Sequence, residues 1–148
     1  MKRIIFSLLA MVLLIGCSND DSSFEQNVAF TTIAHGSQSY FYESNPDGFK
    51  QVFKDAESWN NFMSMAGCEC FSETEIDFNQ FEVIAIVRNS EGHGSDVKIT
   101  EIKETKSSLK VMYTSTDFIT SVISRAYHVV KIPKKNKPDV QFVELSNL

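Results

Sequence analysis

Runs in which apolar and polar residues alternate recur along most of the chain after residue 27. Alternation over roughly four to eight residues is typical of β-strands with one buried face, and clusters of Gly, Pro, Asn, Asp and Ser mark the turns between them. The first strand is expected to end at a turn formed by His35, Gly36 and Ser37. The pattern predicts about seven strands, at 28–33, 48–54, 81–87, 97–103, 109–114, 127–132 and 140–143.

The segment after the second of these strands has the spacing of a helix. Asp55 is a suitable N-cap, Glu57 lies in the first turn, where the helix dipole favours a carboxylate, and Gly67 ends the pattern. Apolar residues recur at helical spacing and are expected to form the buried stripe of this helix: Ala56, Trp59, Phe62, Met63 and Ala66.

These elements together predict an α+β fold, a mainly antiparallel β-sheet with one amphipathic helix packed on it. Phe81–Val87 is apolar on both faces, as expected of a central strand. Short polar connections join this strand to the run 97–103, and that run to 109–114. Connections of this kind favour antiparallel pairing of the three strands.

The N-terminus follows a different pattern. Lys2 and Arg3 precede an apolar run of about 12 residues, against the roughly 20 that span a bilayer, which is typical of a secretory signal peptide. The run ends in Leu14-Ile15-Gly16-Cys17, which resembles the lipobox of bacterial lipoproteins. The resemblance implies cleavage after Gly16 and acyl chains, such as palmitate, on Cys17. Several acyl chains make a stable membrane anchor.

Residues 1–16 are thus expected to be a lipoprotein signal peptide, 17–26 a lipidated acidic tether and 27–148 a single domain. The start of the tether is too polar to bury apolar surface and fold. It also resembles the surface-export signal of lipoproteins in the Bacteroidetes group, with a plain solvated linker as the alternative. We therefore expect a protein of the bacterial cell envelope, anchored by lipid to the outer membrane and exposed at the surface.

Charge and motifs argue against several functions. The net charge of −5 argues against nucleic acid as a partner. No serine lies in a G-x-S-x-G elbow, and no glycine-rich loop of the phosphate-binding type is present, so we predict no catalytic residue and no cofactor. The stretch Gly92-His93-Gly94 is expected to form a hairpin turn and is a candidate binding loop.

Cys68 and Cys70 offer the strongest local chemistry. A C-x-C pair can give two thiolates to a soft metal, but a tetrahedral site needs four ligands and no second cysteine pair exists. A disulfide between residues two apart is strained and easily reduced. An incidental loop pair, a disulfide and a metal site all stay open at this point.

Several motifs occur together in an order that resembles one known family. These are Trp59-Asn60-Asn61-Phe62 on the helix, Ile76-Asp77-Phe78 before the strand 83–87, a glycine turn before Val97, and the tail 126–133. Together they resemble the C-terminal domain of the protease-complex subunit PrcB family, over roughly Val52 to Val143. The resemblance implies an accessory role beside a surface protease.

The first functional hypothesis is therefore a membrane-tethered binding module without catalysis, which docks a protein such as a protease. Its candidate surfaces are the loop around His93 and a strand edge formed by Tyr127, His128 and Lys131, beside a basic turn at 133–138. The alternative is a ligand- or metal-binding lipoprotein that uses Cys68 and Cys70. A hydrolytic enzyme ranks third, because the sequence lacks the motifs for one.

Overall fold

The computed structural model describes residues 25–38, 48–66, 70–88, 94–119 and 125–146. The elements along the chain are β1 (Gln26–Asn27), β2 (Thr31–Gln38), β3 (Phe49–Phe53), α2 (Ala56–Ala66), β4 (Phe81–Val87), β5 (Gly94–Glu104), β6 (Ser108–Phe118), β7 (Arg125–Pro133) and β8 (Asp139–Glu144). No helix in these ranges is long and apolar enough to cross a membrane.

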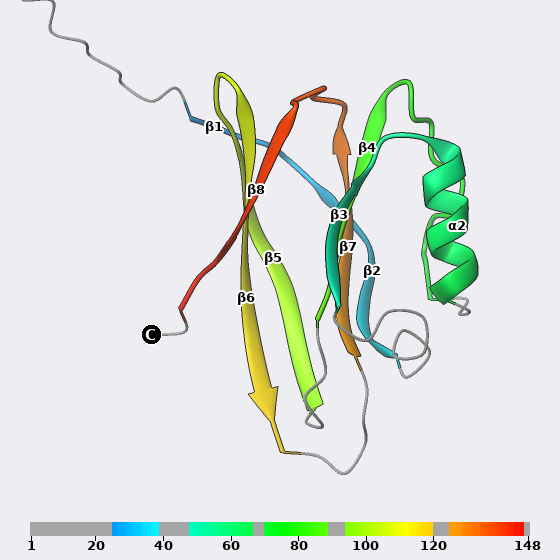
Figure 1. The fold of residues 1–148 in the computed structure, drawn as a ribbon, viewed down its shortest axis with the longest axis vertical. Helices are drawn as coiled ribbons and strands as arrows, with labels where there is room; N and C mark the ends of the chain where they lie inside the picture. The colour runs from blue at the N-terminus through cyan, green and yellow to red at the C-terminus, as the bar shows by residue number, and fades with distance from the viewer. Residues whose placement is uncertain (1–24, 39–47, 67–69, 89–93, 120–124, 147–148) are drawn as a thin grey trace, which may run out of the picture.

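The strands form two four-stranded sheets that face each other, and α2 covers the outer face of one of them (Figure 1). The first sheet has the order β1-β5-β6-β8, and the second sheet, which carries α2, has the order β2-β7-β4-β3. Every pair is antiparallel except β6 with β8, which is parallel. The predicted α+β fold, mainly antiparallel β with one helix packed on it, is confirmed.

Two apolar cores result from this layering. The inner core lies between the sheets, and the outer core lies between the second sheet and α2. β4 serves both, because Ile84 and Ile86 point into the inner core while Val83, Ala85 and Val87 point into the outer one. The prediction that Phe81–Val87 is a central strand is confirmed, since β4 lies between β7 and β3.

α2 begins as its sequence predicts, and Trp59, Phe62 and Ala66 of the predicted stripe are buried, whereas Ala56 in the first turn is exposed and Met63 is only partly buried. The Asp55 carboxylate accepts a hydrogen bond from the Ser58 backbone N–H at 2.8 Å, the geometry of an N-cap. Trp59 and Phe62 are almost completely buried and contact the ring of Phe53. The indole N–H of Trp59 also donates to the carbonyl of Thr74 at 2.9 Å, so the segment after the helix is fixed against it.

The predicted turn at His35–Ser37 is wrong. β2 continues through these residues to Gln38, and His35 lies opposite His128 of β7. Strand pairing overrides the local turn preference here, and a glycine suits the position because a Cβ on Gly36 would lie 3.3 Å from the hydroxyl of Tyr127.

Of the two antiparallel pairings expected among three consecutive strands, one is confirmed and the other is wrong. β5 and β6 form the predicted hairpin, but β4 and β5 belong to different sheets. The chain therefore crosses from the second sheet to the first between these strands. Alternation of apolar residues shows which face of a strand is buried, and it does not show which sheet the strand joins.

Candidate functional site

Several of the predicted site residues lie outside the described residues: Cys17, Cys68, Gly92 and His93. Gly94 is the first residue of β5 and is buried, so it does not form part of an exposed turn. Cys70 is disulfide-bonded, and a disulfide sulfur is not a thiolate ligand for a metal. Within the described ranges, no group of three or more His, Cys, Asp or Glu side chains could hold a metal ion.

The predicted binding edge at Tyr127, His128 and Lys131 is wrong. β7 pairs with β2 on one side and with β4 on the other, so it is an interior strand of the second sheet. Tyr127 and His128 are buried, and the Lys131 ammonium bonds to the Glu73 carboxylate. The unbroken burial of 125–130 is the mark of an interior strand, and the near-continuous apolar run of the sequence there could have indicated it.

The basic turn after β7 is also occupied by contacts within the fold. Lys135 and Lys137 bind the carboxylate of Glu104 at 2.8 and 3.0 Å, and their hydrogen bonds hold the pKa of that group below its usual range. The ammonium of Lys134 donates to the carbonyl of Phe78 at 2.7 Å. These lysines therefore attach the β7–β8 turn to β5 and to the segment before β4.

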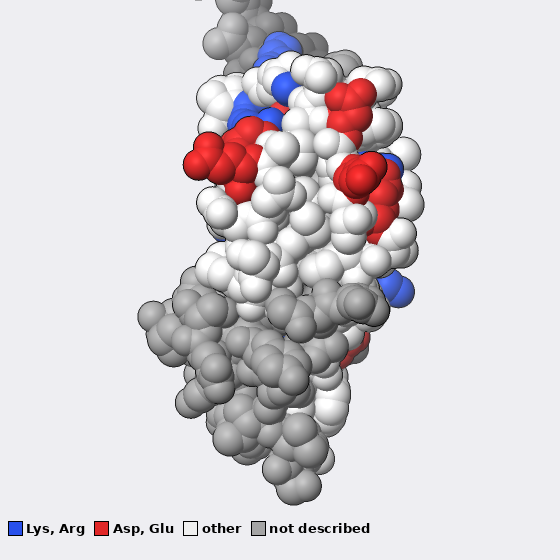
Figure 2. All heavy atoms as spheres, turned by 90° about the vertical axis from the view of Figure 1, so that its right-hand side faces the viewer, with Lys and Arg blue, Asp and Glu red and all other residues white. Residues whose placement is uncertain are grey.

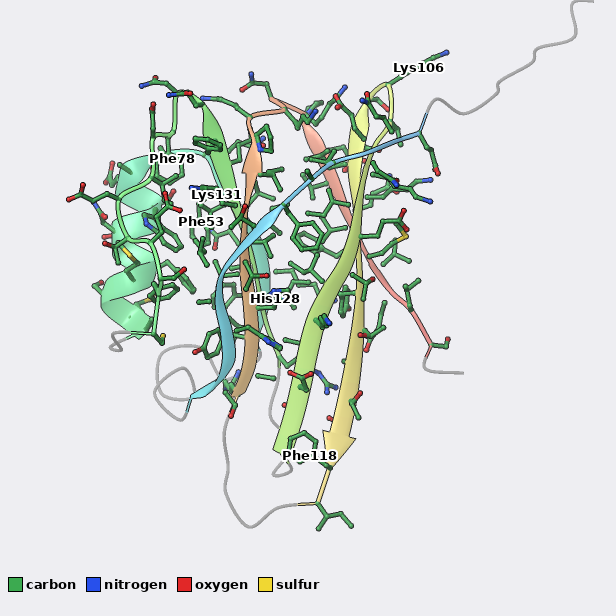
Figure 3. All side chains as sticks on the ribbon, turned by 180° about the vertical axis from the view of Figure 1, so that it is seen from behind. Phe53, Phe78, Lys106, Phe118, His128 and Lys131 are labelled. Carbon is green, nitrogen blue, oxygen red and sulfur yellow. The ribbon has the colours of Figure 1, made fainter. Side chains whose placement is uncertain are left out.

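His128 lies between the two sheets and not at the strand edge that the sequence predicts (Figure 3). Its Nδ1 accepts a hydrogen bond from the backbone N–H of Ile99 in β5 at 2.7 Å, and its Nε2 lies 2.9 Å from the Thr32 hydroxyl of β2. An accepting Nδ1 places the ring proton on Nε2, which then donates to Thr32. One neutral imidazole thus joins both sheets.

The side chain of His35 lies beside this imidazole, and Asp96 lies beside His35. His35 packs against the ring with centroids 4.8 Å apart, and His35 Nε2 in turn lies 2.9 Å from Asp96 Oδ1. Burial is the main cause that lowers the pKa of His128 to about 4; the positive charges of His35 and Lys98 act in the same direction, and Asp96 acts in the opposite one. Both ring nitrogens are engaged within the fold, so the imidazole stabilises the sandwich in its neutral form.

A second polar cluster joins the sheets on the side of β3 and β8. The Lys50 ammonium donates to the Tyr113 hydroxyl at 2.5 Å, and that hydroxyl donates to Glu144 at 3.1 Å. The Ser115 hydroxyl also donates to Glu144, and this is the main reason that the pKa of Glu144 lies below its usual value. Sequence reasoning missed this cluster, because its members come from three strands with no common motif.

The described surface carries a groove of about 450 Å³ between α2 and the irregular segment 74–78. Trp59, Ile76 and Phe78 form its apolar floor, and all three also belong to or pack against the outer core. Its rim is polar and exposed and consists of Asn60, Thr74, Glu75 and Asp77. In Figure 3 Phe78 lies beside α2. This groove could not be predicted from the sequence, because residues 74–78 have no periodic pattern.

Comparison with protein-family models, with curated proteins and with solved structures finds no match to this chain. The arguments for function therefore rest on the chemistry of the chain itself.

Proposed function

We propose that this chain is a lipid-anchored binding module of the bacterial cell envelope, which captures a protein partner and carries out no catalysis. In this proposal Cys17 carries the acyl chains, and the acidic segment after it separates the domain from the outer membrane surface. The resemblance of the sequence to the PrcB family makes a surface protease complex the favoured partner.

The observation that carries the proposal is the groove beside α2. Its floor is apolar and its rim is polar, which is the usual composition of a recognition site. The two polar clusters between the sheets stabilise the fold. His128 joins β5 to β2, and Glu144 accepts hydrogen bonds from Tyr113 and Ser115. General base catalysis needs a side chain whose acceptor atom is available to the substrate, and His128 has both nitrogens engaged.

The proposal is tested by photo-crosslinking in native membranes. A photoreactive amino acid replaces Asn60, which is exposed at the groove, and in a control protein it replaces Gln141, exposed on β8 in the other sheet (Figure 1). We expect an identifiable envelope protein to be crosslinked from position 60 and not from 141, and to be lost when Cys17→Ala releases the chain from the membrane.

An enzymatic activity would overturn the proposal. The decisive result is cleavage of a peptide, ester or glycan by the purified protein, together with a single replacement that abolishes cleavage and leaves the free energy of unfolding unchanged. Ser115→Ala is the first replacement to examine, because Ser115 lies in the one described cluster that combines a serine, a lysine and a carboxylate.

A further inference from the structure

The segment that forms one wall of the groove is held in place at several points. The Ser72 backbone N–H donates to the carbonyl of Ile33, and the indole of Trp59 donates to the carbonyl of Thr74. At the far end, the Asp77 carboxylate accepts hydrogen bonds from the Asn79 N–H and the Gln80 side chain. The wall is thus ordered without a strand or a helix, and a partner would not have to order it on binding.

Between these fixed points the backbone has unused hydrogen-bonding groups. Within the described residues, no hydrogen bond reaches the backbone N–H or carbonyl of Glu75 or of Ile76. Glu75 is exposed, and Ile76 is only partly buried. Exposed, fixed and unpaired main-chain groups are what an extended polypeptide needs in order to add itself as a further strand.

The charge beside these groups is negative. Glu75 makes no ion pair with any described residue, and the hydrogen bonds from Gln80 and Asn79 lower the pKa of Asp77 and keep it ionised. Figure 2, which faces α2, shows acidic residues on both sides of a broad area without charged residues. A cationic side chain next to an apolar one would therefore match both the rim and the floor of the groove.

We infer that the groove between α2 and 74–78 binds an extended segment of the partner protein in which basic and apolar residues alternate. Main-chain pairing at Glu75 and Ile76 fixes the segment, an apolar side chain packs on the partly exposed Phe78, and a Lys or Arg pairs with Glu75. This inference deepens the proposed binding function and rests on it, since it names the chemistry of the partner.

The test uses the full-length protein in detergent and three synthetic peptides, in which leucine alternates with lysine, with glutamate or with serine. Trp59 is the single tryptophan of the chain and lines the groove, so its emission reports occupancy. The lysine peptide should bind best and the glutamate peptide worst. Glu75→Lys should weaken binding of the lysine peptide by roughly five- to tenfold, the loss of an exposed ion pair plus the new repulsion. Asp139→Lys, the same charge change at exposed β8, should not weaken it.

Neighbouring asparagines of α2 supply a steric control. Asn60→Phe fills the groove and should abolish binding of the lysine peptide, whereas Asn61→Phe, on the other flank of the helix, should not. Thermal melts confirm that both variants fold. Equal binding of the basic and acidic peptides, no binding at all, or binding unaffected by Asn60→Phe overturns the inference. A partner crosslinked at position 60 would in that case leave the binding function standing and reject only the basic, extended segment.

Discussion

Protonation of His128 should destabilise the protein as the pH falls from neutrality. The neutral ring accepts the Ile99 N–H through Nδ1, and this bond is lost once Nδ1 carries a proton. The amide of Ile99 would then be buried without an acceptor, beside a buried positive charge. Burial of the ring is the main cause that lowers the pKa of His128 from 6.5 to about 4, and the bond to Ile99 favours the neutral ring in the same way.

The direction and the size of the change in stability follow from the pKa values of His128 in the unfolded and in the folded chain. Between pH 6.5 and 4 the unfolded chain binds a proton at His128 that the folded chain does not, so stability falls as the pH decreases. The stabilisation is fully present above pH 6.5, the pKa of the unfolded group, and is lost as the pH falls to about 4, the pKa of the folded group. A shift of this size corresponds to about 3 kcal/mol, of which about 2 kcal/mol should be lost between pH 7.5 and 5.

Above pH 5, a change in stability reports the titration of His128 and not that of the carboxylates. Glu104, Glu144 and Asp77 also have lowered pKa values, but their unfolded groups titrate near 4 to 4.5 and act below pH 5. The assay is urea unfolding followed by Trp59 emission at each pH. His128→Gln keeps an oxygen acceptor for the Ile99 amide but does not titrate, so its stability should stay flat where that of the wild type falls.

His35→Gln serves as the control, because it removes the neighbouring histidine and leaves the titrating ring in place. Its stability should still fall between pH 7.5 and 5, by somewhat less than that of the wild type, because His35 contributes to the lowered pKa of His128. If the wild type and His128→Gln lose stability in parallel across this range, His128 is not the group responsible and the argument from the Ile99 bond is refuted.

Three further outcomes are expected. Trp59→Ala should lower the free energy of unfolding by about 3 to 5 kcal/mol, measured by circular dichroism, because the buried indole packs on Phe53 and Phe62; a loss below about 1 kcal/mol would contradict this. Cys17→Ala should move the protein from the membrane to the soluble fraction and leave it without a lipid mass shift; unchanged partitioning would rule out the anchor. The double variant Cys68→Ser/Cys70→Ser should lose less than about 2 kcal/mol, since a bridge between residues two apart closes almost no loop, and a larger loss in urea unfolding would contradict that reasoning.

Elements that depend on neighbouring residues could be predicted from local sequence patterns. The cap at Asp55, the stripe of Trp59 and Phe62, and the strand Phe81–Val87 appear where they were expected. Each is decided by residues within a few positions of one another, through hydrogen bonding at a helix end or burial of one face.

Pairings between distant strands could not be predicted in this way. His128 was expected at a strand edge, and nothing near it in the sequence points to Ile99 as its donor. The amide of Ile99 is available because β1 pairs only with Lys103 and Glu104 of β5. The groove beside α2 was missed for a similar reason, since its far wall is an irregular segment that the indole of Trp59 fixes against the helix through the carbonyl of Thr74.

β4 and β7 lie between the two cores and contribute side chains to both, and this arrangement determines how the molecule unfolds. Each strand contributes alternate side chains to both sides, so neither core can be taken apart while the other stays intact. The sandwich and the helix layer are therefore expected to unfold as one cooperative unit. Amide hydrogens of β4 and β7 should exchange with solvent the most slowly, and those of Glu75 and Ile76 should exchange fast, because no hydrogen bond from these two amides is found within the described residues.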